Sequence, residues 1–321
     1  MTTNELFFIM LRAAVWNSPP QLPRVPEPEE WRILLGMSKA HSLQGVMFDA
    51  VMELPAAAGV PRQLAAEWMI EADCVEKDYA AKKAMTAAQM EFWKSNGIDA
   101  VLLKGVSVAA FYPVPEHRVV GDIDWWMPGR DNWRKALELV RAEGYSVSRD
   151  SDGDCSYVSG GIVVEHHRKG MREKGAVGML VMLNEHILHH VMVGGIGMRH
   201  LCDMALAYRH FSGSYDAGEY LCCLKKYGLA KWNELLNAAL KRTLAVPDDI
   251  LPGASIGVTS ADAGRLVDMI MEDGDFGFGR RRRFSGFSSR FSLFMRYAPW
   301  LFVKRWAGLV IGRITFTIFA N

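Results

Sequence analysis

Two aspartates separated by one residue, in the stretch Gly121-Asp122-Ile123-Asp124, are the sharpest chemical feature of the chain. On a β-strand, residues i and i+2 project to the same face, so Asp122 and Asp124 can point the same way. Magnesium prefers oxygen ligands and usually takes one or two carboxylates together with substrate phosphates. The pair therefore predicts metal-assisted phosphoryl transfer, although the same spacing also occurs in glycosyltransferases and as plain surface charge.

Residues on either side of the pair could handle a nucleotide. Gly105 would let backbone N–H groups approach a phosphate, and Lys104 could touch that phosphate or pair with a nearby acid. Arg118 could neutralise phosphate charge or be a surface loop residue. Glu165 offers a third carboxylate, unless it is an exposed strand residue. His167, on the same strand face, could bind phosphate, accept a proton, or be an ordinary hydrogen-bonded histidine.

Short strands interleaved with helices must position these residues. The apolar or alternating runs 99–104, 122–127, 145–148 and 161–167 predict strands. Between the first two, the small residues 106–111 predict a short helix. A longer helix is expected over 133–143, capped by Asp131 and ended by Gly144. This order predicts a compact α/β core of about 70 residues.

Helical segments flank that core on both sides. After Pro61, apolar residues three or four apart give the stripe of one long amphipathic helix: Leu64, Trp68, Ala72, Val75 and Tyr79. Beyond Met179 the helical period returns. We expect an α+β (mixed α/β) fold with a small mixed β-sheet and four regions. These are an N-terminal helical region (1–97), the core (98–175), a helical domain (176–275) and a basic aromatic segment (276–321).

The stretch from Leu102 to Tyr145, with Lys-Gly, Tyr-Pro, Arg and Gly-Asp-Ile-Asp in order, resembles a bacterial group of uncharacterised nucleotidyltransferases. This group belongs to the DNA polymerase β superfamily, which has a minimal nucleotidyltransferase fold. VVEHHR, HILHH and RHLCDMALAYR, further along the chain, resemble later motifs of the same group. The resemblance covers roughly residues 35–210, and its motifs are specific as a set and weak singly.

The resemblance implies roles for individual residues. Asp122 and Asp124 would bind the Mg²⁺ (or Mn²⁺) that escorts an NTP, and Glu165 would share a second metal and help activate the acceptor hydroxyl. Lys104 and Gly105, with Gly121, Arg118 and His167 nearby, would hold the nucleotide. Two departures stand out. Most of the superfamily has Gly-Ser in place of Lys-Gly, and Trp125-Trp126 replaces small aliphatics, where the indoles could stack a base or pack under the sheet.

Polar pairs in the helical domain have weaker interpretations. His186 and His190 lie four residues apart on a predicted helix, but H-E-x-x-H is absent and no further ligand is evident, so no structural zinc is expected. Arg199 and Asp203 are also four apart. We expect them to form a helix-surface or interdomain pair, with substrate contact as the alternative. Gly194-Gly195-x-Gly197 predicts an interhelical loop.

Charge is divided unevenly along the chain. After Asp275 there is no acidic residue, and nine Lys and Arg give this segment a charge of +9 against −8 for the rest. With its aromatics, the 276–321 segment could lie on an anionic membrane or bind a polyanion such as RNA. It could equally be a helical cover that is basic because the body is acidic. Five cysteines without C-x-x-C, and no basic leader or apolar span, predict a cytoplasmic protein, at most peripheral to a membrane.

The leading hypothesis is a metal-dependent transferase that moves an NMP from an NTP to an acceptor hydroxyl and releases pyrophosphate. A small molecule, a peptide or a biosynthetic intermediate is the favoured acceptor class, because an acidic body disfavours a large RNA surface. A toxin-type enzyme that modifies tRNA or protein is the alternative. A catalytically silent module that binds nucleotide or a partner is a third reading, against which the presence of all three acids argues.

Overall fold

The computed structural model combines many helices with one five-stranded mixed sheet, which confirms the α+β expectation. It describes residues 2–55, 58–150, 153–193, 195–253, 257–275 and 287–304. The chain divides into two compact units, 1–172 and 173–321, and each is described by itself. The predicted core (98–175) and the helices before it fall almost entirely within the first unit. The finer four-region division stays a prediction.

Three helices begin the first unit: α1 (Thr3–Trp16), α2 (Pro28–Ala40) and α3 (Gln44–Met52). α1 starts in a capping box, in which the Thr2 and Glu5 side chains each bond the other residue's backbone N–H. Their apolar faces form a small core whose large members are fully buried, among them Phe7, Met10 and Trp31. These helices are thus a packed helical subdomain.

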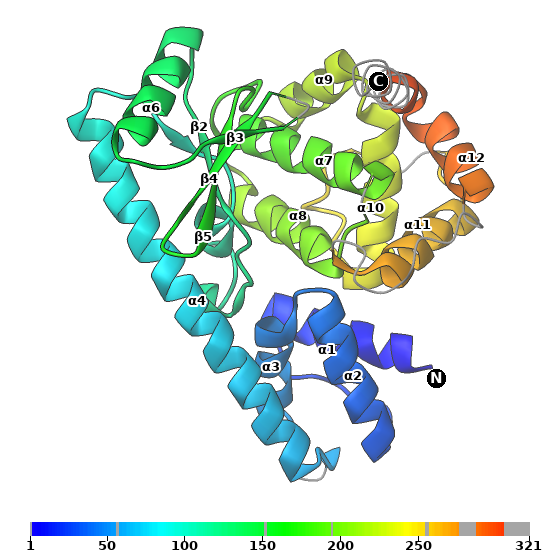
Figure 1. Ribbon diagram of the computed structural model, residues 1–321. Helices are drawn as coiled ribbons and strands as arrows, with labels where there is room; N and C mark the ends of the chain where they lie inside the picture. Colours follow the sequence, from blue (N-terminus) through cyan, green and yellow to red (C-terminus); the bar gives the residue numbers. More distant parts are fainter. Residues whose placement is uncertain are drawn as a thin grey trace, which may run out of the picture. The chain divides into compact units, whose positions relative to one another are not determined.

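The long helix α4 (Arg62–Ser95) connects this helical part to the sheet (Figure 1). Its predicted apolar stripe is buried throughout, and the helix ends before Gly97 as expected. α4 contacts α2 and α3, and its Trp68 Nε1 donates to the backbone oxygen of Gln44 at 3.0 Å. At its other end Trp93 packs into the core beneath the sheet. One continuous helix therefore fixes the sheet relative to the N-terminal helices.

The sheet has the strand order β1-β2-β5-β4-β3. Its strands are β1 (Val101–Leu102), β2 (Ile123–Trp126), β3 (Ser148–Arg149), β4 (Cys155–Ser159) and β5 (Ile162–His167). β2 and β5 are parallel, and every other pairing is antiparallel. β1 is shorter than its predicted run, β3 overlaps the predicted run 145–148 only at Ser148, and β4 was not predicted. One face of the sheet packs on a core that includes Ile123, Trp125, Tyr157 and Val164.

Helical connections complete the α/β core: α5 (Val106–Ala109), η2 (Pro115–His117) and α6 (Arg130–Ala142). The predicted cap of α6 is wrong. The helix begins after Gly129, which follows Pro128 and turns the chain with a φ of +88°. Asp131 lies inside the first turn of the helix. Ala136, Leu137 and Val140 are buried, as their spacing predicts.

The second unit is helical, with α7 (Gly175–Val193), α8 (Met198–Phe211), α9 (Ala217–Tyr227), α10 (Ala230–Leu244), α11 (Ser260–Asp273) and α12 (Phe287–Tyr297). Gly195 and Gly197 lie in the loop between α7 and α8, as expected. Arg199 is buried and pairs with Asp275 at 2.9 Å. Asp203 is buried as well, so a helix-surface pair is wrong for these two residues. None of the described helices combines the length and the apolarity needed to cross a bilayer.

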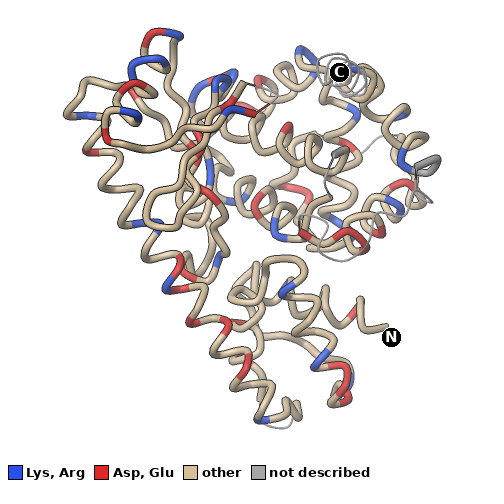
Figure 2. Tube along the Cα trace, viewed as in Figure 1, with Lys and Arg blue, Asp and Glu red and all other residues tan. Residues whose placement is uncertain are grey.

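The described part of the basic segment packs on the second unit. Figure 2 marks the arginines of α12 and the acidic residues of α11. Arg290 binds Asp273 at 2.6 Å and Arg296 binds Asp262 at 2.8 Å, while Phe294 is buried. These residues behave as a helical cover held to an acidic helix. The run of arginines at 280–283 and the residues after 304 lie outside the described part of the chain.

Candidate active site

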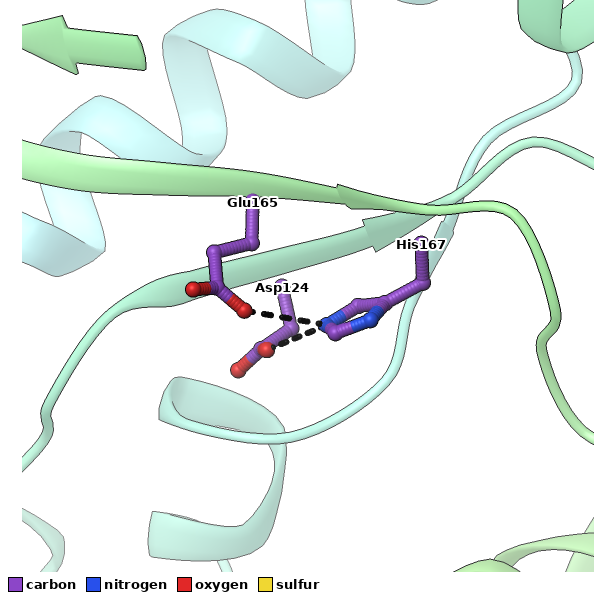
Figure 3. A group of neighbouring side chains, drawn as sticks. All are labelled: Asp124, Glu165 and His167. Atoms are coloured by element: carbon purple, nitrogen blue, oxygen red, sulfur yellow. Dashed lines mark hydrogen bonds and ion pairs between the residues drawn. The ribbon is translucent and has the colours of Figure 1, made fainter. Parts of the chain in front are cut away.

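The parallel pairing of β2 and β5 brings the predicted acids together. In its register Asp124 lies opposite Glu165, and Trp126 lies opposite His167. Residues paired this way share one face of the sheet, so the carboxylates of Asp124 and Glu165 and the imidazole of His167 project to the same side. Figure 3 shows the three side chains converging over the two strands. The opposite face carries Ile123 and Trp125 into the core.

Asp124 is the centre of this group. Its side chain is fully buried, and its Oδ1 accepts from His167 Nε2 at 2.7 Å and from Lys104 Nζ at 2.8 Å. The Nε2 atom of His167 also lies 3.6 Å from Glu165 Oε2. Of the two interpretations of Lys104, the structure therefore records pairing with an acid. An aspartate held by two cationic groups is fixed in position within the site.

Asp154, which the sequence analysis missed, lies behind His167. Its Oδ2 is 2.9 Å from His167 Nδ1, and its Oδ1 accepts from the backbone N–H of Arg168 at 2.7 Å. Asp154 immediately precedes β4, and Arg168 immediately follows β5. Because β4 itself was not predicted, no signal in the sequence connected this aspartate to the site.

The charges of the group shift one another's pKa values. Burial raises the pKa of Asp124, but Lys104 and His167 outweigh it, so the pKa lies well below its usual range. Burial lowers the pKa of His167, yet its hydrogen bonds to two carboxylates raise it to about 10. Burial, and then the charges of neighbouring carboxylates, raise the pKa values of Asp122 and Glu165. Negative charge is thus concentrated here beyond what Lys104 and His167 neutralise.

This concentration of donors fits a divalent cation. One ligand atom each from Asp124, Glu165 and His167 lies within 4.8 Å of the other two, the one such group found among the described residues. Asp124 Oδ2 is buried and accepts no hydrogen bond from the described residues. A buried oxygen without a hydrogen bond lowers the stability of the fold by about 1–3 kcal/mol unless a ligand binds it. Asp122 is not a member of the group, although the charge of Asp124 helps to raise its pKa.

The Lys104-Gly105 turn has a conformation that requires glycine. Gly105 has φ +74°, and a Cβ there would lie 3.2 Å from the backbone oxygen of Asp122. α5, which follows, has only four residues, so its dipole is small. By contrast, a Cβ on Gly121 would meet nothing within 4 Å. The turn therefore packs directly against the backbone that carries the aspartates.

Arg118 supports this turn from within. Its guanidinium donates to the carbonyl oxygens of Gly105 at 3.2 Å and Val119 at 3.3 Å, and it lies over the Tyr112 ring. The residue is only 4% exposed, so the surface-loop alternative is wrong. Lys82 of α4 acts similarly and donates to the backbone oxygen of Val120 at 2.6 Å. Both side chains hold the backbone before β2 in place.

The two tryptophans of β2 pack within the protein. Trp125 is fully buried, and its Nε1 donates to Gln89 Oε1 at 2.7 Å. A Cβ on Gly170 would lie 1.9 Å from the Trp126 ring, so this indole covers Gly170. His166, on the core face, lies between aromatic rings, and burial lowers its pKa to about 4. Trp125 is therefore not available to stack a base.

The remaining predicted polar residues lie in the second unit. The rings of His186 and His190 are 4.3 Å apart, and that of His200 on α8 lies 5.6 Å from His186. Arg199 pairs with Asp275, as described above.

Comparison with known proteins finds one family match. Residues 27–178 match the model of a family described as uncharacterised nucleotidyltransferase. The matched stretch contains α4, the whole sheet and every residue of the group around Asp124. No curated protein and no solved structure matches the chain. The family resemblance drawn from the sequence is thereby confirmed.

Proposed function

We propose that this chain, whose residues 27–178 match a nucleotidyltransferase family model, transfers a nucleoside monophosphate from an NTP to an acceptor hydroxyl. The observation that carries the proposal is the convergence of Asp124, Glu165 and His167 on one face of the parallel β2–β5 pair. Asp122, one residue before β2, adds a further carboxylate next to them. Such a cluster suits phosphate chemistry more than sugar or acyl chemistry.

The proposed reaction is an in-line displacement. The acceptor oxygen forms a bond to the α-phosphorus, the bond from that phosphorus to the bridging oxygen breaks, and pyrophosphate leaves. Glu165, which lies opposite Asp124 on β5, accepts the proton of the acceptor hydroxyl as the oxygen attacks. A divalent cation held by Asp124 and Glu165, with Asp122 beside them, would neutralise charge on the triphosphate and the leaving group.

The chain's other residues prepare the site. Gly105 allows the turn before α5 to lie close to the Asp122 backbone, where its N–H groups would face a phosphate. Arg118 and Lys82 hold that backbone through carbonyl oxygens. Lys104, on Asp124 Oδ1, places a positive charge beside the position of the triphosphate. Together these contacts fix the site before substrate binds.

The distribution of charge along the chain bears on the class of acceptor. We favour a small molecule, a peptide or a biosynthetic intermediate, because the body of the chain is acidic. Two arginines of the basic segment are already paired with α11, which removes them from contact with a membrane or polyanion. A toxin-type enzyme remains the alternative, and growth arrest on expression that Asp124→Asn relieves would support it.

Replacement of the acids tests the proposal. Purified protein is incubated with each α-³²P-labelled NTP, Mg²⁺ or Mn²⁺ and a cell extract. Asp124→Asn and Glu165→Gln should each lower labelling of the acceptor by more than about 100-fold, since both change groups at the reacting centre. Asp131→Asn, an exposed acid on α6, is the matched control and should label normally. Equal labelling by Asp124→Asn and the unmodified protein would refute the assignment.

A further inference from the structure

Both ring nitrogens of His167 face carboxylates. Nδ1 lies 2.9 Å from Asp154 Oδ2, while Nε2 points at Asp124 Oδ1 at 2.7 Å and Glu165 Oε2 at 3.6 Å. Histidines that bind metals in proteins almost always donate the other ring N–H to a carboxylate or carbonyl, which fixes the tautomer and the ring orientation. Both nitrogens donate, Nδ1 to Asp154 and Nε2 to Asp124, so Nε2 is the atom directed at Asp124 and Glu165.

Asp154 is held so that it can orient the ring. Its Oδ1 accepts from the Arg168 backbone N–H at 2.7 Å, and its own backbone N–H donates to Asp150 Oδ1 at 2.9 Å. β4 and β5 pair in antiparallel fashion with Cys155 opposite His166, and this pairing fixes the distance between the backbones of Asp154 and His167. The side chain of His167 is 16% exposed and that of Asp154 is 26% exposed. Rotation of the imidazole would break at least two hydrogen bonds.

We infer that His167 Nε2 is a metal ligand together with Asp124 and Glu165, and that Asp154 is the residue that positions it; this inference rests on the proposed function. The site is then a mixed set of two oxygen donors and one nitrogen donor. Mg²⁺ strongly prefers oxygen ligands, whereas first-row transition ions accept imidazole readily. The site therefore favours Mn²⁺ over Mg²⁺. Asp124 and Glu165 would be neutralised by such an ion, and the Nε2 proton of His167 would pass to solvent when the ion binds.

Spectroscopy of bound Mn²⁺ tests the ligand directly. The full-length protein, labelled with ¹⁵N-histidine, is loaded with Mn²⁺ without nucleotide, and electron spin echo modulation is recorded. We expect ¹⁵N modulation in the unmodified protein and its loss in His167→Gln. Mn²⁺ titration followed by electron paramagnetic resonance should show a Kd about 10–100-fold weaker in Asp154→Asn, with a smaller change for Mg²⁺ measured by competition. Asp131→Asn is the control and should match the unmodified protein.

The outcomes separate this inference from the proposed function. Bound Mn²⁺ without nitrogen modulation, or modulation that persists in His167→Gln, overturns the role of His167 while nucleotidyl transfer can continue. An unchanged Mn²⁺ affinity in Asp154→Asn overturns the positioning role. Absence of both metal binding and nucleotidyl transfer would overturn the proposed function as well. The measurement on the unmodified protein needs no variant, so a variant that fails to fold does not affect it.

Discussion

At the scale of single residues, the site depends on a few contacts around one buried aspartate. Asp124 has Lys104 and His167 on one oxygen, and burial leaves its other oxygen without a partner among the described residues. The sequence predicted site roles for Asp124, Glu165 and Lys104 because their types and spacing match a known chemistry. It could not identify Asp154, since an aspartate in a polar stretch is indistinguishable from a loop residue until the strands pair.

Gly105 provides a test of this local geometry. Gly105→Ala should lower the free energy of unfolding by about 1 kcal/mol or more, because φ is +74° and the new Cβ would lie 3.2 Å from the Asp122 oxygen. Urea unfolding followed by circular dichroism measures the change. Gly121→Ala is the matched control for stability, since its Cβ meets nothing within 4 Å. Equal stability of the two variants would contradict the account of the turn.

At the scale of elements, helices with a regular apolar stripe were predictable and short strands were not. α4 was predicted to within a residue or two, because burial along one face leaves a clear spacing. β4 has only Cys155 and Tyr157 facing inward, while Val158 is 60% exposed, so its sequence lacks a clean alternation. β4 is a strand because it pairs with β5 through backbone hydrogen bonds. The register that places Asp124 opposite Glu165 likewise comes from tertiary pairing.

His117 of η2 joins two helices of the first unit. Its Nδ1 lies 2.6 Å from Asp49 of α3, and its Nε2 lies 2.8 Å from Glu76 of α4. Both ring nitrogens can donate only when the imidazole is protonated. Burial lowers the pKa of His117, but the hydrogen bonds to Asp49 and Glu76 outweigh it and raise the pKa. The protonated form therefore holds the loop before β2 to α3 and α4.

This pKa shift predicts a pH dependence of stability. A pKa raised on folding gives a contribution that is fully present below the unfolded value of about 6.5 and is lost as pH rises through the folded value. Urea unfolding of the unmodified protein should therefore show stability that falls as pH rises above neutral. His117→Gln should lose stability at low pH and remove this part of the slope. His210→Gln, an exposed residue of α8, is the control and should keep the slope. An unchanged slope in His117→Gln would show that this contact does not contribute.

At the scale of the whole molecule, the chain combines a first unit that contains nearly all of the family match with a second, helical unit. The uneven charge seen in the sequence left three roles open for the 276–321 segment: membrane contact, polyanion binding and a helical cover. The sequence alone could not choose among them, because packing decides whether the Lys and Arg side chains are already paired with acids of the same chain. In its described residues, Arg290 and Arg296 bind acids of α11, and Tyr297 donates to Asp262 at 2.9 Å. These contacts favour a cover over an open polybasic surface.

Phe294 tests whether α12 is part of the folded second unit. The side chain is 1% exposed and contacts Trp232 and Phe302, so Phe294→Ala should cost about 3–5 kcal/mol of stability. Trp300→Ala is the matched control. Its ring is 72% exposed, and the change should cost little. Thermal unfolding of both variants measures the difference. A Phe294→Ala protein as stable as the control would mean that α12 does not stabilise this unit.

The central claim, nucleotidyl transfer at Asp124, is tested most directly by comparing two labels on one NTP. The protein is incubated with α-³²P- or γ-³²P-labelled ATP, divalent cation and acceptor extract, beside Asp124→Asn. We predict that the α-label joins the acceptor, that the γ-label is recovered as pyrophosphate, and that both products disappear in Asp124→Asn. A γ-label on the acceptor, or an α-labelled product that survives the loss of the Asp124 carboxylate, would contradict the account.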